Sequence, residues 1–250
     1  MRTTGYDPAV SVGVPRAARD AGLRSYMLSV YNYMASGVLL TGIVALLFAR
    51  SPYFASMFNV VETARGAVLR PTLLGWVITF APLAFVLIMS FGQARMRAST
   101  LQAMFWGFAV VMGLSLSTIF IAYTGVSIAQ TFFATAAAFG ALSLWGYTTK
   151  KDLSGWGTFL IMGVVGIIVA SLINVLFLRS VGLNLAISAI GVLIFAGLTA
   201  YDTQKIKSIY FQVAGYGEAM AKTAVMGALS LYLDFINMFL FLLRLFGDRR

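Results

Sequence analysis

Two carboxylates stand within or at the end of long apolar runs of this sequence. Asp234 lies in the middle of Ala224–Phe246, and Asp202, in Ala200-Tyr201-Asp202-Thr203-Gln204, closes the run before it. Ionisable side chains are costly in the hydrocarbon of a bilayer, so both are functional candidates if these runs cross a membrane. Two carboxylates in contact at low dielectric cannot both ionise cheaply, and such a pair would share a proton and titrate as a unit. Since the chain has no histidine, this pair is the group expected to respond near neutral pH.

The composition indicates an integral membrane protein. Of 250 residues, 60% are hydrophobic and 10% charged, and the mean hydropathy is +0.89, whereas a soluble domain carries roughly a quarter charged residues. The net charge of +10 comes from Lys and Arg beside apolar runs, which favours topology signals and contacts with anionic lipids over binding of nucleic acid. The absence of cysteine and histidine excludes disulfides, thiol nucleophiles, Cys/His metal sites and histidine-based triads.

Seven apolar runs have about the ~20 residues that a bilayer-spanning helix needs. Their residues do not alternate in polarity, so helices are favoured over the strands of a barrel. We therefore predict an all-α protein with seven transmembrane helices in residues 25–250, preceded by a flexible cytoplasmic tail at residues 1–24. The runs are Met27–Ala49, Leu73–Phe91, Leu101–Tyr123, Val126–Tyr147, Trp156–Leu178, Leu183–Tyr201 and Ala224–Phe246.

Lys and Arg are more frequent in the amino-terminal tail and in the second, fourth and sixth connections than on the other side. This bias predicts a cytoplasmic amino terminus, and no cleavable signal precedes the first run. The sixth and seventh runs are then joined on the inside as antiparallel neighbours, so Asp202 and Asp234 can face each other. The connection 202–223 either extends the sixth helix or lies along the membrane surface, and Gly215 and Gly217 end it.

Oxygen ligands are those that Ca²⁺ prefers, so the two carboxylates, with backbone carbonyls and water, would make a weak calcium site. Asn174, Asn184 and Asn237 are further oxygen donors, although helix contacts are the more ordinary role for an asparagine. The competing interpretation of Asp234 is structural, since buried polar groups in membranes often specify helix packing.

Three segments together resemble one family, the bacterial YccA-type branch of the transmembrane Bax inhibitor motif proteins. The resemblance covers nearly the whole chain from about residue 25, and Arg95 and Arg97, between the second and third runs, also fit it. Its segments are Thr149-Lys150-Lys151-Asp152-Leu153-Ser154, Ala200-Tyr201-Asp202-Thr203-Gln204-Lys205-Ile206 and Ala228-Leu229-Ser230-Leu231-Tyr232-Leu233-Asp234-Phe235-Ile236-Asn237.

The resemblance implies a fold in which six helices wrap the seventh, and a pH-sensitive calcium leak across the bacterial inner membrane. It implies that Asp202 and Asp234 act as proton sensor and pore closure, with Ca²⁺ as the transported ion and no cofactor. It also implies an arginine latch on Asp202, for which Arg95 is the best match and Arg97 the alternative. Taken alone, both arginines read equally well as topology charges.

Other functions compete with the channel. The resemblance also suggests a regulator that binds a membrane-bound protease or quality-control machinery without conducting ions. An intramembrane aspartyl protease would place two aspartates in successive helices, but Leu231-Tyr232-Leu233 precedes Asp234 where such enzymes have a Gly-x-Gly motif. A retinal protein would need a lysine in the last run, which has none. We therefore predict that the protein is not an enzyme.

Overall fold

The computed structural model describes residues 16–63 and 66–250. Within these ranges, seven helical segments are long and apolar enough to cross a membrane, with α3 and α4 counted as one. The predicted all-α, seven-span architecture is therefore confirmed. The helices are α1 (Arg16–Ala49), α2 (Leu73–Gly92), α3 (Ala98–Leu116), α4 (Ile119–Ala122), α5 (Gly125–Thr148), α6 (Ser154–Ile173), α7 (Val181–Val213) and α8 (Gly217–Phe246).

Two spans continue well beyond their apolar runs. α1 begins at Arg16 rather than near Met27, so residues 16–24, which we expected in the flexible tail, form its first turns. α7 passes Asp202 and ends at Val213, so the connection 202–223 extends the sixth span. Backbone hydrogen bonds within a helix do not depend on apolar side chains, so polar turns can continue a span beyond the bilayer. The rest of the predicted tail, residues 1–15, lies outside the described residues.

A three-residue turn at residues 214–216 reverses the chain between α7 and α8. Gly215 has a φ of +91°, in the left-handed region that glycine adopts without steric cost. The tight turn makes α7 and α8 antiparallel neighbours, as the sequence predicted, and it fixes which of their residues are level.

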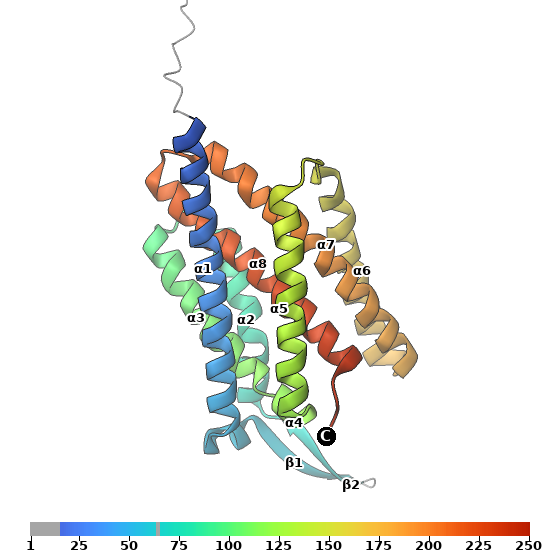
Figure 1. The fold of residues 1–250 in the computed structure, drawn as a ribbon. Coiled ribbons are helices and arrows are strands. Elements are labelled where there is room, and N and C mark those ends of the chain that lie inside the picture. The colour runs from blue at the N-terminus through green and yellow to red at the C-terminus, as the bar shows by residue number, and fades with distance from the viewer. Residues whose placement is uncertain (1–15, 64–65) are drawn as a thin grey trace, which may run out of the picture.

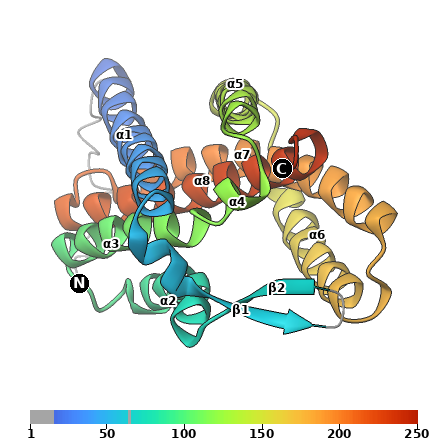
Figure 2. The same ribbon diagram turned by 90° about the horizontal axis from the view of Figure 1, so that it is seen from below.

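α8 is the central helix of the bundle. In its most apolar stretch 61% of the residues are buried, against 17–28% in the other six spans. α7, α1, α5 and α3 pack directly on α8, whereas α2 packs on α3 and α6 packs on α7. Figure 1 shows α8 crossing behind α1 and α5, and Figure 2 shows the same bundle from below, with α2 and α6 away from α1 and α5. The prediction of a central seventh span is confirmed, with α2 and α6 in an outer position.

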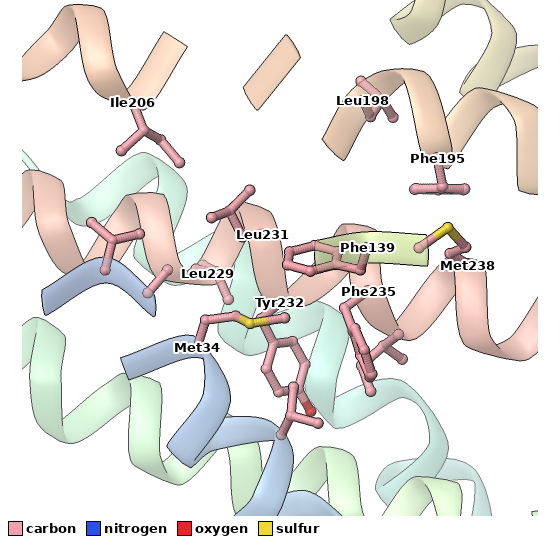
Figure 3. Packing of buried hydrophobic residues seen from close by; sticks show 14 of the residues in the cluster. Met34, Phe139, Phe195, Leu198, Ile206, Leu229, Leu231, Tyr232, Phe235 and Met238 are labelled. Atoms are coloured by element: carbon pink, nitrogen blue, oxygen red, sulfur yellow. The ribbon is translucent and has the colours of Figure 1, made fainter. Parts of the chain in front are cut away.

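A buried hydroxyl network joins α8 to α1 and α3. The Tyr232 ring packs edge-on against Phe105 and Phe108, with centroids 6.3 and 5.0 Å away. Its hydroxyl lies 2.7 Å from Thr41 Oγ1, which donates to the carbonyl of Ala109 at 2.8 Å, so Tyr232 is the donor in the first contact. In Figure 3 Tyr232 points away from α7, whereas Leu231 and Met238 point toward it. These hydrogen bonds satisfy polar groups that would otherwise be costly in a membrane core.

The two ends of the bundle are both net positive, but they differ in structure and in their number of Lys and Arg residues. The basic end is where α1 and α8 begin and α7 ends. It carries Arg24, Arg95, Arg97, Lys150, Lys151, Lys205, Lys207 and Lys222. The hairpin end carries strands β1 (Phe58–Thr63) and β2 (Gly66–Pro71), paired antiparallel with Phe58 opposite Pro71. This hairpin within the long connection 50–71 was not expected from the sequence.

The end of α8 is fixed to the turn before α5 at the hairpin end. Tyr123 forms an antiparallel bridge with Arg249, and the Thr124 N–H donates to the carbonyl of Asp248 at 3.1 Å. The Asp248 N–H donates in turn to Ser127 Oγ at 2.9 Å. The last described residues therefore hold α8 in place along its axis.

Candidate functional site

Asp202 lies on the face of α7 that packs against α8. Residues 191, 195, 198, 202 and 206 follow one another at spacings of three and four, so they share one face of the helix. At the two ends of this row, Gly191 lies against the ring of Phe241 and Ile206 lies against Gly227, both of which belong to α8. The row therefore places Asp202 at the α7–α8 interface.

Asp234 lies on the matching face of α8 and is 3% exposed. The contacts of Ile206 with Gly227 and of Gly191 with Phe241 make Asp202 level with Leu231 in this antiparallel pair. Asp234 is three residues further along α8, an axial offset of about 4.5 Å. Its carboxylate interacts electrostatically with that of Asp202. The structure thus brings together the two aspartates that the sequence singled out.

The Asp234 carboxylate is buried with incomplete hydrogen bonding. Its Oδ2 atom has no hydrogen-bond partner among the described residues. Asp202 is only half-buried, and Lys205 is the nearby cation that acts on it. An unpaired charge in a low-dielectric interior is strongly unfavourable, so Asp234 is stable there only when a proton or cation compensates it.

Neither Arg95 nor Arg97 contacts Asp202 in this structure. Both arginines are exposed in the α2–α3 connection. Among the side chains that the structure describes, in residues 20–62 and 70–250, the one ion pair within 4.0 Å joins Lys222 to Glu218. The predicted latch is thus not among the described contacts, and its role in another conformation stays a prediction.

Glu218, which the sequence analysis did not select, links α8 to α3 beside this connection. Its Oε1 atom accepts a hydrogen bond from the backbone N–H of Ala98, the first residue of α3, at 2.8 Å. An acid is favourable at a helix amino terminus, where backbone N–H groups lack partners within the helix. One feature of the sequence could have pointed to Glu218: it directly follows Gly215 and Gly217, which end the α7–α8 connection, so it stands at the start of the last span.

Gln204 joins two of the segments that carried the family resemblance. Its Oε1 accepts from the Leu153 N–H and its Nε2 donates to the Lys151 carbonyl, both at 2.8 Å. In the same loop, Asp152 Oδ1 accepts from the Ser154 N–H at 2.9 Å. This hydrogen bond holds the pKa of the Asp152 carboxyl below its usual value. The α5–α6 loop is therefore attached to α7 two residues beyond Asp202.

Replacing Gln204 with alanine is expected to release the α5–α6 loop. Two hydrogen bonds are lost, each worth about 1 kcal/mol, so amide exchange of residues 150–154 should accelerate roughly thirtyfold. Hydrogen–deuterium exchange read by mass spectrometry on the full chain measures this. Gln212→Ala, at an exposed position on the same helix, is the control. Unchanged exchange in the Gln204 variant would show that the loop is held by other contacts.

The described residues contain no group of three His, Cys, Asp or Glu side chains that could hold a metal ion. Two of the candidate asparagines bond locally: Asn174 donates to the Ser180 carbonyl at 3.1 Å, and Asn237 donates to the Leu233 carbonyl at 2.8 Å. Asn174 Oδ1 already accepts from the Ser180 N–H at 2.9 Å, whereas the bond of Asn237 uses only its Nδ2. A cation at the α7–α8 interface would therefore depend mainly on the two carboxylates with backbone carbonyls and water. Such a ligand set suits brief occupancy by a passing ion better than tight binding.

Comparison with known proteins identifies the family. Residues 23–250 match the family model described as "Inhibitor of apoptosis-promoting Bax1". An uncharacterised protein of Caulobacter vibrioides is 46% identical over 98% of this chain and 97% of its own length. The "Inner membrane protein YbhL" of Escherichia coli K12 is also 46% identical, over 92% of this chain and 94% of its own length. The chain belongs to the Bax inhibitor-1-like family of membrane proteins, which confirms the resemblance found in its sequence.

Proposed function

We propose that this protein is a pH-sensitive Ca²⁺ leak channel in which Asp202 and Asp234 form the proton sensor. The observation that carries the proposal is the buried carboxylate of Asp234, which lacks a partner at Oδ2 and lies beside a second carboxylate. A packing role would be better served by a fully hydrogen-bonded polar group, because an unsatisfied buried carboxylate destabilises the fold. The destabilisation caused by the unsatisfied Asp234 carboxylate is explained if this site exchanges protons and cations.

Proton sharing supplies the switch. With one proton between them, the two carboxylates carry a single charge and α7 stays against α8. Loss of that proton, or entry of a dication, changes the electrostatic energy of the α7–α8 interface. The change is large because charges interact more strongly at low dielectric than in water. Since α8 is held at both ends by Glu218 and by residues 247–250, we expect this change in energy to act on the packing of α7 against α8. Movement of α7 also reaches the α5–α6 loop through Gln204.

The membrane and orientation are part of the same proposal. The Escherichia coli relative is named an inner membrane protein, and the structure has seven candidate spans in its described ranges. The basic end would face the cytoplasm, because Lys and Arg near span ends favour that side. Calcium would then cross between the hairpin end and the basic end.

The function is tested by Ca²⁺ flux into liposomes that contain the purified full chain and a calcium-sensitive dye, measured from pH 5 to pH 8. We expect flux above that of empty liposomes, with roughly a tenfold difference between the extremes, because a change of about 1.4 kcal/mol in the gating equilibrium shifts populations tenfold. Flux no greater than in empty liposomes at every pH would reject the channel and favour the regulator that binds a membrane protease.

A further inference from the structure

A lateral crevice of about 500 Å³ opens between α1 and α5. These two helices lie on the same side of α8 in Figures 1 and 2. The lining side chains come from one face of each helix, at spacings of three and four residues. They are Arg24, Met27, Leu28 and Tyr31 of α1, and Phe139, Gly140, Ser143, Leu144 and Tyr147 of α5.

The walls of the crevice are apolar and leave room for a chain. A Cβ atom added at Gly140 would meet no atom within 4 Å, so the α5 wall is open toward its inner end. Leu28 and Leu144, on the two rims, are 51% and 63% exposed. From Arg24 to Tyr31 the crevice runs about 10 Å along α1, which is most of one bilayer leaflet, about 15 Å of hydrocarbon.

The polar groups at the deep end of the crevice already have partners. Tyr31 Oη lies 2.6 Å from Ser143 Oγ, which lies 2.9 Å from Thr203 Oγ1. Thr203 donates to the carbonyl of Thr199 at 2.7 Å, so the chain runs as donors from Tyr31 to Ser143 to Thr203. Because these hydroxyls are satisfied, an occupant of the crevice needs no polar group at this depth.

The mouth of the crevice is cationic. Arg24 is exposed, and it forms no ion pair within 4.0 Å with any carboxylate in the described part of the chain. Lys207 Nζ lies 5.0 Å from the centre of the Tyr147 ring and donates to the Tyr147 carbonyl at 2.8 Å. Arg24 is about 38 Å from Ala49 along α1. This exceeds the ~30 Å hydrocarbon core, so Arg24 reaches the headgroup layer.

We propose that the α1–α5 crevice binds an anionic glycerophospholipid, with one acyl chain along the Gly140 wall and the phosphate against Arg24. The apolar walls match an acyl chain, and the unpaired guanidinium matches a phosphate, which it can bind through two parallel hydrogen bonds. The site is separate from the Asp202–Asp234 pair and does not rest on ion conduction. Through Ser143 and Thr203 the bound lipid would also support the part of α7 that carries Asp202.

Native mass spectrometry of the detergent-purified full chain, incubated with phosphatidylglycerol or with phosphatidylcholine of the same acyl chains, tests the proposal. We expect the wild type to retain one phosphatidylglycerol with roughly tenfold preference, the equivalent of about 1.4 kcal/mol. Arg24→Gln should reduce the preference to less than about twofold, because it removes the charged contact. Gly140→Leu should weaken retention of both lipids several-fold, because the leucine fills the acyl channel.

Two matched controls separate this site from general effects of charge and bulk. Gly42→Leu makes the same substitution on α1 at an exposed position, where a Cβ meets no atom within 4 Å, and should leave retention unchanged. Lys150→Gln removes an exposed charge at the same basic end and should preserve the preference. Equal retention of the two lipids by the wild type, or wild-type retention by Gly140→Leu, would overturn the proposal whether or not the protein conducts Ca²⁺.

Discussion

Replacing Asp234 with asparagine is expected to remove most of the pH dependence of Ca²⁺ flux. Asparagine has nearly the same shape but cannot ionise, so the pair loses the proton that it shares, and Asp202 is left without a carboxylate neighbour on α8. We expect the flux ratio between pH 5 and pH 8 to fall from roughly tenfold to less than about twofold. The measurement is the dye-loaded proteoliposome assay, with wild type and variant reconstituted at equal protein-to-lipid ratio.

Asp152→Asn is the matched control for this experiment. The Asp152 carboxylate accepts the Ser154 N–H at 2.9 Å, and this hydrogen bond holds its pKa below the usual value. A lowered pKa keeps the group charged throughout pH 5 to 8, and its stabilising hydrogen bond is lost only when the pH falls through that lowered value. The control should therefore keep the wild-type pH profile. A steep profile in the Asp234 variant would refute the carboxylate pair as the sensor.

Replacing Gly146 with alanine is expected to lower the stability of the bundle strongly. Gly146 is buried on α5, and an added Cβ would overlap the carbonyl oxygen of Ala200 and lie 2.9 Å from its Cα. Backbone atoms of α7 cannot move aside as a flexible side chain would. Overpacking of this kind costs about 1–3 kcal/mol, which corresponds to roughly 2–12 °C in the apparent melting temperature of a chain this size.

Gly140→Ala, six residues earlier on the same helix, provides the comparison. Its Cβ meets no atom within 4 Å, and alanine is the better helix former by up to about 1 kcal/mol, so stability should be unchanged or slightly raised. Each variant is heated in detergent, and the monodisperse fraction is followed by size-exclusion chromatography. This measurement gives the apparent melting temperatures of both variants. Equal apparent melting temperatures for the two variants would show that close packing of α5 on α7 at Gly146 does not stabilise the bundle.

The sequence predicted the features that depend on local composition. Each apolar run became a span because hydropathy and length are read directly from the chain. The meeting of Asp202 and Asp234 was predictable because consecutive spans that are joined on the same side of the membrane are antiparallel neighbours. The central position of the seventh span came from the family resemblance, since the apolar pattern of Ala224–Phe246 does not by itself show what surrounds it.

Features that depend on contacts between distant segments were not predicted. The pairing of Gln204 with Lys151 and Leu153 needs the fold to bring residues about 50 positions apart together. The Ala98–Glu218 bond and the bridge of Tyr123 with Arg249 are of the same kind. The hairpin in residues 58–71 was missed because hydropathy distinguishes spans from connections but does not assign structure within a connection. The early start of α1 was missed because polar residues continue a helix without an apolar signal.

The central position of α8 also bears on how the protein is made. α8 follows the other six spans in the chain, so α1, α3, α5 and α7 enter the bilayer before the helix on which they pack exists. Until then Asp202 has no α8 neighbour, and Phe105 and Phe108 lack the Tyr232 ring that packs against both of them. Biogenesis must therefore end with a helix entering the middle of a bundle rather than joining its edge. Until that helix arrives, the contacts open to the six earlier spans are those that they make with one another, such as the close approach of Gly146 to Ala200.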